Sequence, residues 1–286
     1  ECKDDGSVVT PADFAMQDRL VRELKQLWPE FDILGEEMSE DEQMSVIKRE
    51  AGYWCIDPLD GTTNYAAGLP FFSVSIALIM NRQQEIGLIY DPVRDEMFTA
   101  IKGQGAYLNG QRIEYPAKQV KSNKPVVAMI DLKRLPRSLK VKLMTENIFA
   151  AQRNIGSSAI EWCWVSDSRF DIYLNGGQKL WDYAAGSLIF SEAGGHSVSF
   201  DGDAVFRGQF EGRSVLACHD KELFDYWYDW IGIGQLLFFK RAIQAECNLH
   251  SRIYILYRLA TVDWRMMFLI FVSSLSSSLP RKPLLA

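Results

Sequence analysis

The feature that most constrains this chain is the segment Asp-Pro-Leu-Asp-Gly-Thr-Thr at residues 57–63, which directly follows a short apolar stretch. Pro58 fixes its own φ angle and removes a backbone donor, so the turn is held with the carboxylates of Asp57 and Asp60 facing one side. The Leu59 carbonyl then lies between them as a third oxygen, and magnesium prefers oxygen ligands in such an arrangement. A capped turn is the competing interpretation, because Asp-Pro and Asp-Gly pairs are common turn formers.

Gly61 and Thr62 add donors for an anion to this turn. Gly61 lets the backbone approach closely, and the N–H groups of both residues, at what is expected to be a helical turn, can receive phosphate oxygens. The segment therefore supplies metal ligands and anion donors together, which favours a phosphate-handling metal site over a simple turn.

Three further carboxylates are candidates for the same site. Glu36 ends a short strand about twenty residues before Asp57 and is placed to bind metal and orient a water, although paired glutamates are more often a solvated edge. Asp182 is expected at the N-cap of a helix, where capping is the alternative to closing a metal cage from the opposite side. Asp13 lies in the first turn of another helix, where a favourable helix-dipole contact competes with a weaker additional metal.

Charge and cysteine content exclude several classes of protein. The net charge of −6 and the pI near 5.3 argue against a nucleic-acid binder. A phosphate-handling protein with this acidic balance needs positive charge at its site, which metal ions held by carboxylates would supply. The five cysteines are odd in number, widely spaced and without a CxxC pair, which argues against a disulfide framework or zinc site and favours a reducing cytoplasm.

The apolar pattern predicts two halves, residues 1–122 and 123–230, joined near a polar stretch with two prolines. The first half begins with a helix and continues as a meander of strands, and the second half alternates strands and helices. We expect an exposed loop or helix over 38–50. The predicted helices span 11–28, 138–151, 158–168, 182–193 and 220–230, and the predicted strands span 31–34, 53–56, 72–80, 86–90, 97–100, 106–108, 126–130, 170–174 and 215–217.

The two ends of the chain differ from this pattern. The start, Glu-Cys-Lys-Asp-Asp-Gly, is not typical of a signal peptide and suggests an amino-terminal truncation. The tail over 231–286 mixes basic and apolar residues, and we expect it to be poorly ordered. Its continuous apolar run over 266–272 is too short to span a bilayer. A membrane-surface or partner-binding helix within 235–272 is the alternative.

The motifs, taken in order, resemble those of the inositol monophosphatase family, which are lithium-sensitive, magnesium-dependent sugar phosphatases. They are Gly-Glu-Glu, Asp-Pro-Leu-Asp-Gly-Thr-Thr-Asn, Trp-Asp-x-Ala-Ala-Gly and Glu-Ala-Gly-Gly, within a similarity that covers about residues 3–230. The resemblance implies a layered α-β-α-β-α fold of the α+β class, as in inositol monophosphatase and fructose bisphosphatase. It also implies two or three magnesium ions per site and a homodimer. The family's first helix, before the Lys3 region, is missing here, and the tail has no recognised counterpart.

The resemblance also implies roles for individual residues. Glu36 and Thr62 match the catalytic pair that positions and activates the attacking water. Asn175 stands where the inositol enzymes carry a glutamate that contacts substrate hydroxyls, and an amide offers fewer acceptor sites. The implied metal ligands are Glu36, Asp57, the Leu59 carbonyl, Asp60 and Asp182, with Asp13 for a third ion, and the implied substrate contacts are Gly61, Thr62, Gly156, Ser157, Ser158, Asn175 and Asp182.

The expected activity is hydrolysis of a small sugar or inositol monophosphate by metal-activated water, without a covalent phosphoenzyme. Histidinol phosphate, fructose 1,6-bisphosphate and a 3′-phosphorylated nucleotide are alternative substrates, although no base-binding pocket is identifiable. A non-catalytic regulator on the same scaffold is the alternative from a different class, and a membrane-attached partner protein acting through 235–272 is a third. The expected partner is therefore a small phosphorylated molecule, with neither nucleic acid nor membrane.

Overall fold

The computed structural model describes residues 8–49, 52–115, 126–146, 148–208, 210 and 212–233. These residues all belong to the first of the two units into which the chain divides, Glu1–Gly234. The predicted boundary between halves near residue 122, and the tail beyond residue 233, lie outside the described residues. No helix in the described part combines the length and apolar character that a membrane crossing requires.

A seven-stranded sheet forms from the first part of the chain, and its strands lie side by side in chain order. The first two strands are parallel and all later neighbours are antiparallel. The strands are β1 (Asp32–Gly35), β2 (Tyr53–Asp60), β3 (Ser73–Met80), β4 (Gln83–Asp91), β5 (Glu96–Ile101), β6 (Gly105–Leu108) and β7 (Gln111–Arg112).

A five-stranded sheet forms from the later part, in the order β11-β12-β10-β8-β9. β8, β9 and β10 run parallel, and β12 is antiparallel to both of its neighbours. The strands are β8 (Val127–Asp131), β9 (Ala151–Arg153), β10 (Ile172–Gln178), β11 (His196–Val198) and β12 (Arg213–Cys218).

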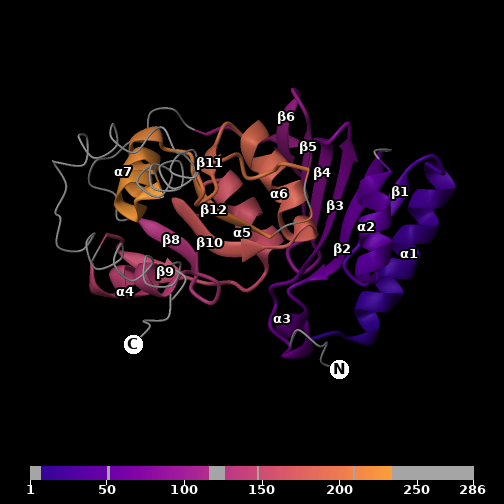
Figure 1. The fold of residues 1–286 in the computed structure, drawn as a ribbon, viewed down its shortest axis with the longest axis horizontal. Coiled ribbons are helices and arrows are strands. Elements are labelled where there is room, and N and C mark those ends of the chain that lie inside the picture. Colours follow the sequence, from indigo (N-terminus) through magenta and orange to yellow (C-terminus); the bar gives the residue numbers. More distant parts are fainter. Residues whose placement is uncertain are drawn as a thin grey trace, which may run out of the picture. The chain divides into compact units, whose positions relative to one another are not determined.

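Helices complete a layered arrangement, seen edge-on in Figure 1. α1 covers one face of the large sheet, α5 and α6 fill the layer between the two sheets, and α4 and α7 cover the other face of the small sheet. This confirms the predicted α-β-α-β-α fold. The helices are α1 (Pro11–Leu27), α2 (Glu40–Lys48), α3 (Thr62–Ala66), α4 (Arg137–Thr145), α5 (Ser158–Ser166), α6 (Leu180–Glu192) and α7 (Lys221–Ile231).

The side-chain alternation of β2 shows how the sequence builds these layers. Trp54 and Ile56 pack with α1, whereas Tyr53 and Cys55 belong to the central core that contains α5 and α6. Because successive side chains of a strand point to opposite faces, Asp57 is directed toward the central helical layer. The apolar pattern of β2 therefore fixes the side on which its terminal carboxylate lies.

Several sequence predictions need correction. The helix predicted over 138–151 forms, but it ends at Thr145 and not at 151, because the chain then enters β9, which pairs with β8. The residues after α4 include Ile148 and Phe149, which pack on the outer core of the small sheet and so mimic a continued helical pattern. The segment predicted as a loop or helix over 38–50 contains helix α2. The short strands β7, β9 and β11 were not predicted.

Asp182 also differs from its predicted place. It is the third residue of α6, not the N-cap, which is Lys179. The helix begins two residues earlier than the pattern indicated because Leu180 and Trp181 are buried within it. One carboxylate oxygen of Asp182 accepts a hydrogen bond from the Lys179 N–H at 2.8 Å, which is the reciprocal half of a capping box.

Candidate active site

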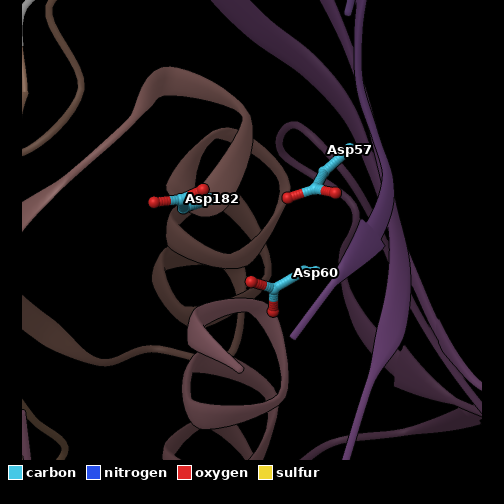
Figure 2. A group of neighbouring side chains, drawn as sticks. All are labelled: Asp57, Asp60 and Asp182. Carbon is cyan, nitrogen blue, oxygen red and sulfur yellow. The ribbon is translucent and has the colours of Figure 1, made fainter. Parts of the chain in front are cut away.

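Three carboxylates from two distant stretches of the chain converge at one place. Asp57 and Asp60 lie at the end of β2, and Asp182 lies in the first turn of α6. One oxygen from each residue lies within 4.8 Å of the others. Figure 2 shows the three carboxyl groups around one space between the strand and the helices. The structure therefore brings together three of the predicted metal ligands.

The end of β2 holds its two carboxylates through a local irregularity. The pairing of β2 with β3 shifts between Asp57 and Asp60, so the Asp-Pro-Leu-Asp segment forms a bulge within the strand and not a turn after it. The Leu59 N–H donates to an Asp57 carboxylate oxygen at 3.0 Å, which fixes that side chain against its own backbone. A bulge of this kind redirects side chains, here so that both acids face the central layer.

The Asp60 carboxylate is held by the amino terminus of α5. One oxygen accepts hydrogen bonds from the Ser157 hydroxyl and from the Ala159 N–H, the latter at 2.7 Å. Ser157 is also the N-cap of α5, and its side chain is fully buried. The loop predicted to bind substrate thus contributes Ser157 to the orientation of a metal ligand.

Burial and mutual repulsion make ionisation of the three carboxyl groups unfavourable without a counter-ion. Desolvation, followed by the negative charge of Glu36, raises the pKa of Asp57 well above its ordinary value. Desolvation raises the pKa of Asp60, and desolvation together with the Asp60 charge raises the pKa of Asp182 to about 8. Like charges sharing a buried site disfavour ionisation, so a bound cation would offset this repulsion.

Glu36 lies beside the cluster because β1 and β2 are parallel. Gly35 pairs with Ile56, so the next residues, Glu36 and Asp57, leave neighbouring strands at the same sheet edge. Glu36 is half-buried, and its charge raises the pKa of both Asp57 and Asp182. Glu36 therefore lies close to the cluster, outside the group of three carboxylates whose oxygens lie within 4.8 Å of one another.

Asp13 and Thr62 form a second hydrogen-bonded group. The Thr62 hydroxyl lies 2.9 Å from an Asp13 carboxylate oxygen and 2.9 Å from the Leu59 carbonyl, with either as its acceptor. The other Asp13 oxygen accepts from the Thr10 N–H at 2.7 Å and the Thr10 hydroxyl at 2.6 Å, completing the capping box of α1. Asp13 thus links the start of α1 to the predicted catalytic threonine, outside the three-carboxylate cluster.

Gly61 connects the bulge to α3 in a conformation that requires glycine. Its φ is +92°, in the left-handed region. An added Cβ would lie 2.7 Å from the Phe71 carbonyl oxygen. The glycine therefore permits the left-handed connection to α3 and the close contact with the Phe71 backbone.

The remaining predicted substrate contacts differ in their surroundings. Gly156 is exposed and Ser158 is half-buried. Asn175 is 2% exposed, and its amide serves the bulge of β10: the oxygen accepts from the Gly177 N–H at 2.9 Å and the nitrogen donates to the Tyr173 hydroxyl at 3.3 Å. The Asn175 amide is thus committed to the strand that carries it.

Sequence reasoning missed two charged residues near the cluster. Glu161 is 1% exposed, accepts from the N–H groups of Ile155 and Gly156 at 3.0 and 3.2 Å, and has its pKa raised to about 8 chiefly by desolvation. Its signal is a single acid within the apolar helix Ala-Ile-Glu-Trp-Cys-Trp-Val. Arg134, in the loop after β8, lowers the pKa of Asp60 and Asp182, and no local pattern marks it.

The donor set fits a hard divalent cation. All three clustered ligands are carboxylates, and oxygen ligands suit magnesium, calcium or manganese better than softer metals. No histidine or cysteine belongs to the metal-ligand group found among the described residues. The arrangement can therefore hold magnesium through Asp57, Asp60 and Asp182.

Comparisons with known proteins agree with this geometry. The model of the inositol monophosphatase family matches residues 2–227. The chain is 36% identical over 203 residues to the Nus factor SuhB of Pasteurella multocida, covering 70% of this chain and 74% of that protein. It is 30% identical over 223 residues to inositol monophosphatase 1 of Bos taurus, covering 76% and 78%.

Solved structures resemble the fold as well. The crystal structure of the extragenic suppressor protein suhB from Bartonella henselae superposes with a TM-score of 0.68 at 30% identity, covering 81% of this chain and 87% of that one. A structure of an IMPase/NADP phosphatase complexed with Mg2+ and phosphate has a TM-score of 0.67 at 22% identity, covering 78% and 83%, and shares the fold.

Proposed function

This chain belongs to the inositol monophosphatase family, and from that premise we propose that it is a magnesium-dependent phosphomonoesterase. Its substrate is a small sugar or inositol monophosphate. The observation that carries the proposal is the convergence of Asp57, Asp60 and Asp182, with one oxygen of each within 4.8 Å of the others. Asp57 and Asp60 are buried and Asp182 is half-buried, so a bound cation would offset their mutual repulsion, and a phosphate monoester needs the same positive charge.

The ligand set proposed for magnesium comprises the three clustered carboxylates together with Glu36 and the Leu59 carbonyl. Asp13 is proposed to help hold an additional, weaker ion. When bound, magnesium lowers the pKa of a ligated water and neutralises charge on the phosphate and the leaving oxygen. The residues of the chain hold that ion, orient the water and bind the phosphate.

Glu36 and Thr62 are proposed to position the attacking water. Where the Thr62 hydroxyl donates its single proton to Asp13 or to the Leu59 carbonyl, its oxygen remains able to accept a hydrogen bond from a water. The Glu36 carboxylate, close enough to raise the pKa of Asp57, is assigned as the acceptor of the water's proton. The N–H groups of Gly61 and Thr62 are assigned to phosphate oxygens.

The proposal includes finer properties that follow from the family. We assign inhibition by lithium, a homodimer and a cytoplasmic location. Histidinol phosphate, fructose 1,6-bisphosphate and a 3′-phosphorylated nucleotide are the alternative substrates. Lithium titration of phosphate release and sedimentation of the purified chain test the first two properties independently of the substrate.

The decisive experiment measures inorganic phosphate released from a panel of these monoesters with magnesium and with a chelator. Asp60→Asn is expected to remove nearly all magnesium-dependent phosphate release. The protein is expected to stay folded, because the amide oxygen still accepts hydrogen bonds from the Ser157 hydroxyl and the Ala159 N–H. Asp225→Asn, which removes an exposed carboxylate of a surface ion pair, is the matched control and is expected to retain activity. Substantial turnover by Asp60→Asn would contradict the proposed role.

A non-catalytic regulatory role is the second candidate. It is favoured by the similarity to proteins named Nus factor SuhB. The complete carboxylate cluster favours catalysis, since a regulator that does not hydrolyse phosphate has no need of all three converging acids. The absence of magnesium-dependent phosphate release across the whole panel, in a folded protein that still binds magnesium, would support the regulatory role instead.

A further inference from the structure

A single arginine lies beside the carboxylate cluster in a position that the proposed chemistry leaves unexplained. Arg134 belongs to the loop between β8 and α4, and its guanidinium donates a hydrogen bond to the Gly177 carbonyl of β10. The aliphatic part of the side chain crosses Gly177, where an added Cβ would lie 3.7 Å from the Arg134 Cδ and 3.9 Å from its Cβ. The arginine is therefore laid along the end of β10.

The backbone around Arg134 is built for this close approach. A Cβ added at Gly176 would lie 2.1 Å from the Arg134 carbonyl oxygen and 2.8 Å from the Leu135 nitrogen. No side chain larger than that of glycine fits between the loop and the strand. The paired glycines thus hold the arginine-bearing loop directly against β10.

The same backbone leads to the metal cluster. Two residues after Gly177, the Lys179 N–H donates to the Asp182 carboxylate at 2.8 Å. The Arg134 charge is close enough to lower the pKa of Asp60 as well as that of Asp182. β8 and β10 are parallel and end together at this edge, and ligands of parallel sheets bind beyond such carboxyl ends.

Arg134 retains most of its hydrogen-bonding capacity. A guanidinium has five N–H donors, and among the described residues the Gly177 carbonyl is its one hydrogen-bond acceptor. The side chain is exposed, and within the described residues no carboxylate forms an ion pair with it. The neighbouring Asn175 amide is buried and committed to its own strand. Lys133 and Lys179 are also exposed near this edge, and Arg134 differs from them in that its contact with the Gly177 carbonyl directs its guanidinium.

We propose that Arg134 binds a second anionic group of the substrate, a carboxylate or a phosphate carried a few bonds from the phosphate ester. This rests on the proposed phosphatase function and narrows its substrates. Among those proposed, it favours fructose 1,6-bisphosphate and acidic sugar phosphates over inositol monophosphate and neutral sugar monophosphates. The preferred substrates are phosphomonoesters with an additional negative charge, because the planar guanidinium matches the two oxygens of a carboxylate or phosphate. Neutral polyol monophosphates lack a group for this contact.

The test compares matched substrates that differ in the second anion. Glycerol 3-phosphate and 3-phosphoglycerate form the carboxylate pair, and fructose 1-phosphate and fructose 1,6-bisphosphate form the phosphate pair. Arg134→Gln is expected to lower kcat/KM for the anionic members roughly 10- to 100-fold, mainly through KM, as for one charge-assisted hydrogen bond. The neutral members lack that bond and are expected to lose less, namely only the effect of removing a positive charge beside Asp60 and Asp182. Lys133→Gln removes the adjacent exposed charge and is the matched control.

The outcomes separate this assignment from its alternatives. An equal loss for neutral and anionic substrates would show that Arg134 only balances the charge of the cluster, and would overturn the assignment. The assignment would also be overturned if Arg134→Gln kept the wild-type ratio of kcat/KM between the anionic and the neutral member of both pairs. A loss confined to one pair identifies the anion as a carboxylate or a phosphate. Calorimetric binding of the same compounds with calcium gives this comparison without turnover, so an absence of phosphate release refutes only the phosphatase function.

Discussion

Glu161 provides a prediction that depends on one buried proton. Its carboxyl group is 1% exposed, lies in the first turns of α5 and has a pKa raised to about 8, chiefly by desolvation and further by the charges of Asp131 and Asp60. A raised carboxyl pKa stabilises the fold below the unfolded pKa, and that stabilisation is lost as pH rises through the folded pKa. Ionisation of Glu161 should therefore destabilise the protein progressively toward alkaline pH.

The magnitude follows from the two pKa values. With 4.5 for the unfolded chain and about 8 for the folded one, the cost grows by about 4 kcal/mol between pH 5 and pH 9. Glu161→Gln removes this cost and keeps the acceptor oxygen for the Ile155 and Gly156 N–H groups. The new amide N–H2 adds a penalty of about 1–3 kcal/mol if it is unpaired, but that penalty does not vary with pH.

The assay is urea unfolding of the wild type and the variant at several pH values between 5 and 9, in the presence of a chelator. The acids of the metal cluster titrate in both proteins, so the difference between them reports Glu161 together with its coupling to Asp60. The variant should gain stability relative to the wild type as pH rises, whereas Glu222→Gln, at an exposed glutamate of α7, should follow the wild type. A stability difference between Glu161→Gln and the wild type that stays constant with pH would refute the reasoning.

Three further perturbations test the site. Gly61→Ala is expected to lower the free energy of unfolding by about 1–3 kcal/mol and to reduce phosphate release. The reasons are the φ of +92° at this position and the contact of the added Cβ with the Phe71 carbonyl oxygen. An unchanged urea midpoint and an unchanged activity would contradict this. Ser157→Ala is expected to cost about 1 kcal/mol of stability through the lost cap and to weaken magnesium binding by releasing Asp60, as measured by urea unfolding and calorimetry. The magnesium-induced rise in Tm should be smaller at pH 6 than at pH 9, since the ion must displace the proton of Asp182, whose pKa is about 8; a rise independent of pH would argue against this cluster as the site.

The fold near the site is largely predictable because its signals are local. The apolar stretch before Asp57 predicts a buried strand, and the alternation of Tyr53 to Ile56 fixes which face its terminal acid occupies. The helix over 11–28 is predicted by the cap at Thr10, the proline at Pro11 and the apolar repeat, and α1 forms with each of these features. Its residue type and its expected place at a helix start made Asp182 a candidate for the site, and the resemblance of the motifs assigned it as a metal ligand beside acids more than one hundred residues earlier.

The parts that escaped prediction depend on contacts between distant segments. The Ser157 hydroxyl donates a hydrogen bond to Asp60, which is 97 positions away, so a segment that resembled a substrate loop also orients a proposed metal ligand. Glu161 and Arg134 owe their importance to surroundings supplied by other elements, and a single charged residue gives no periodic signal. The break between α4 and β9 was missed because Ile148 and Phe149 continue an apolar pattern while packing on the small sheet.

The small residues of the Trp-Asp-Tyr-Ala-Ala-Gly motif explain how the metal cluster keeps its dimensions. A Cβ added at Gly186 would lie 2.4 Å from the Trp162 Cβ, so glycine sets the separation of α6 from α5. At the neighbouring residue of α6, a Cβ added at Gly87 of β4 would lie 2.8 Å from the Ala185 carbonyl oxygen, so a second glycine sets the separation of the helix from the large sheet. The helix that carries Asp182 is thus held between the element that orients Asp60 and the sheet that carries Asp57. Packed cores respond to volume changes of a single methyl group. The distances among the three carboxylates therefore depend on the packing of α6 as well as on the three acidic residues themselves.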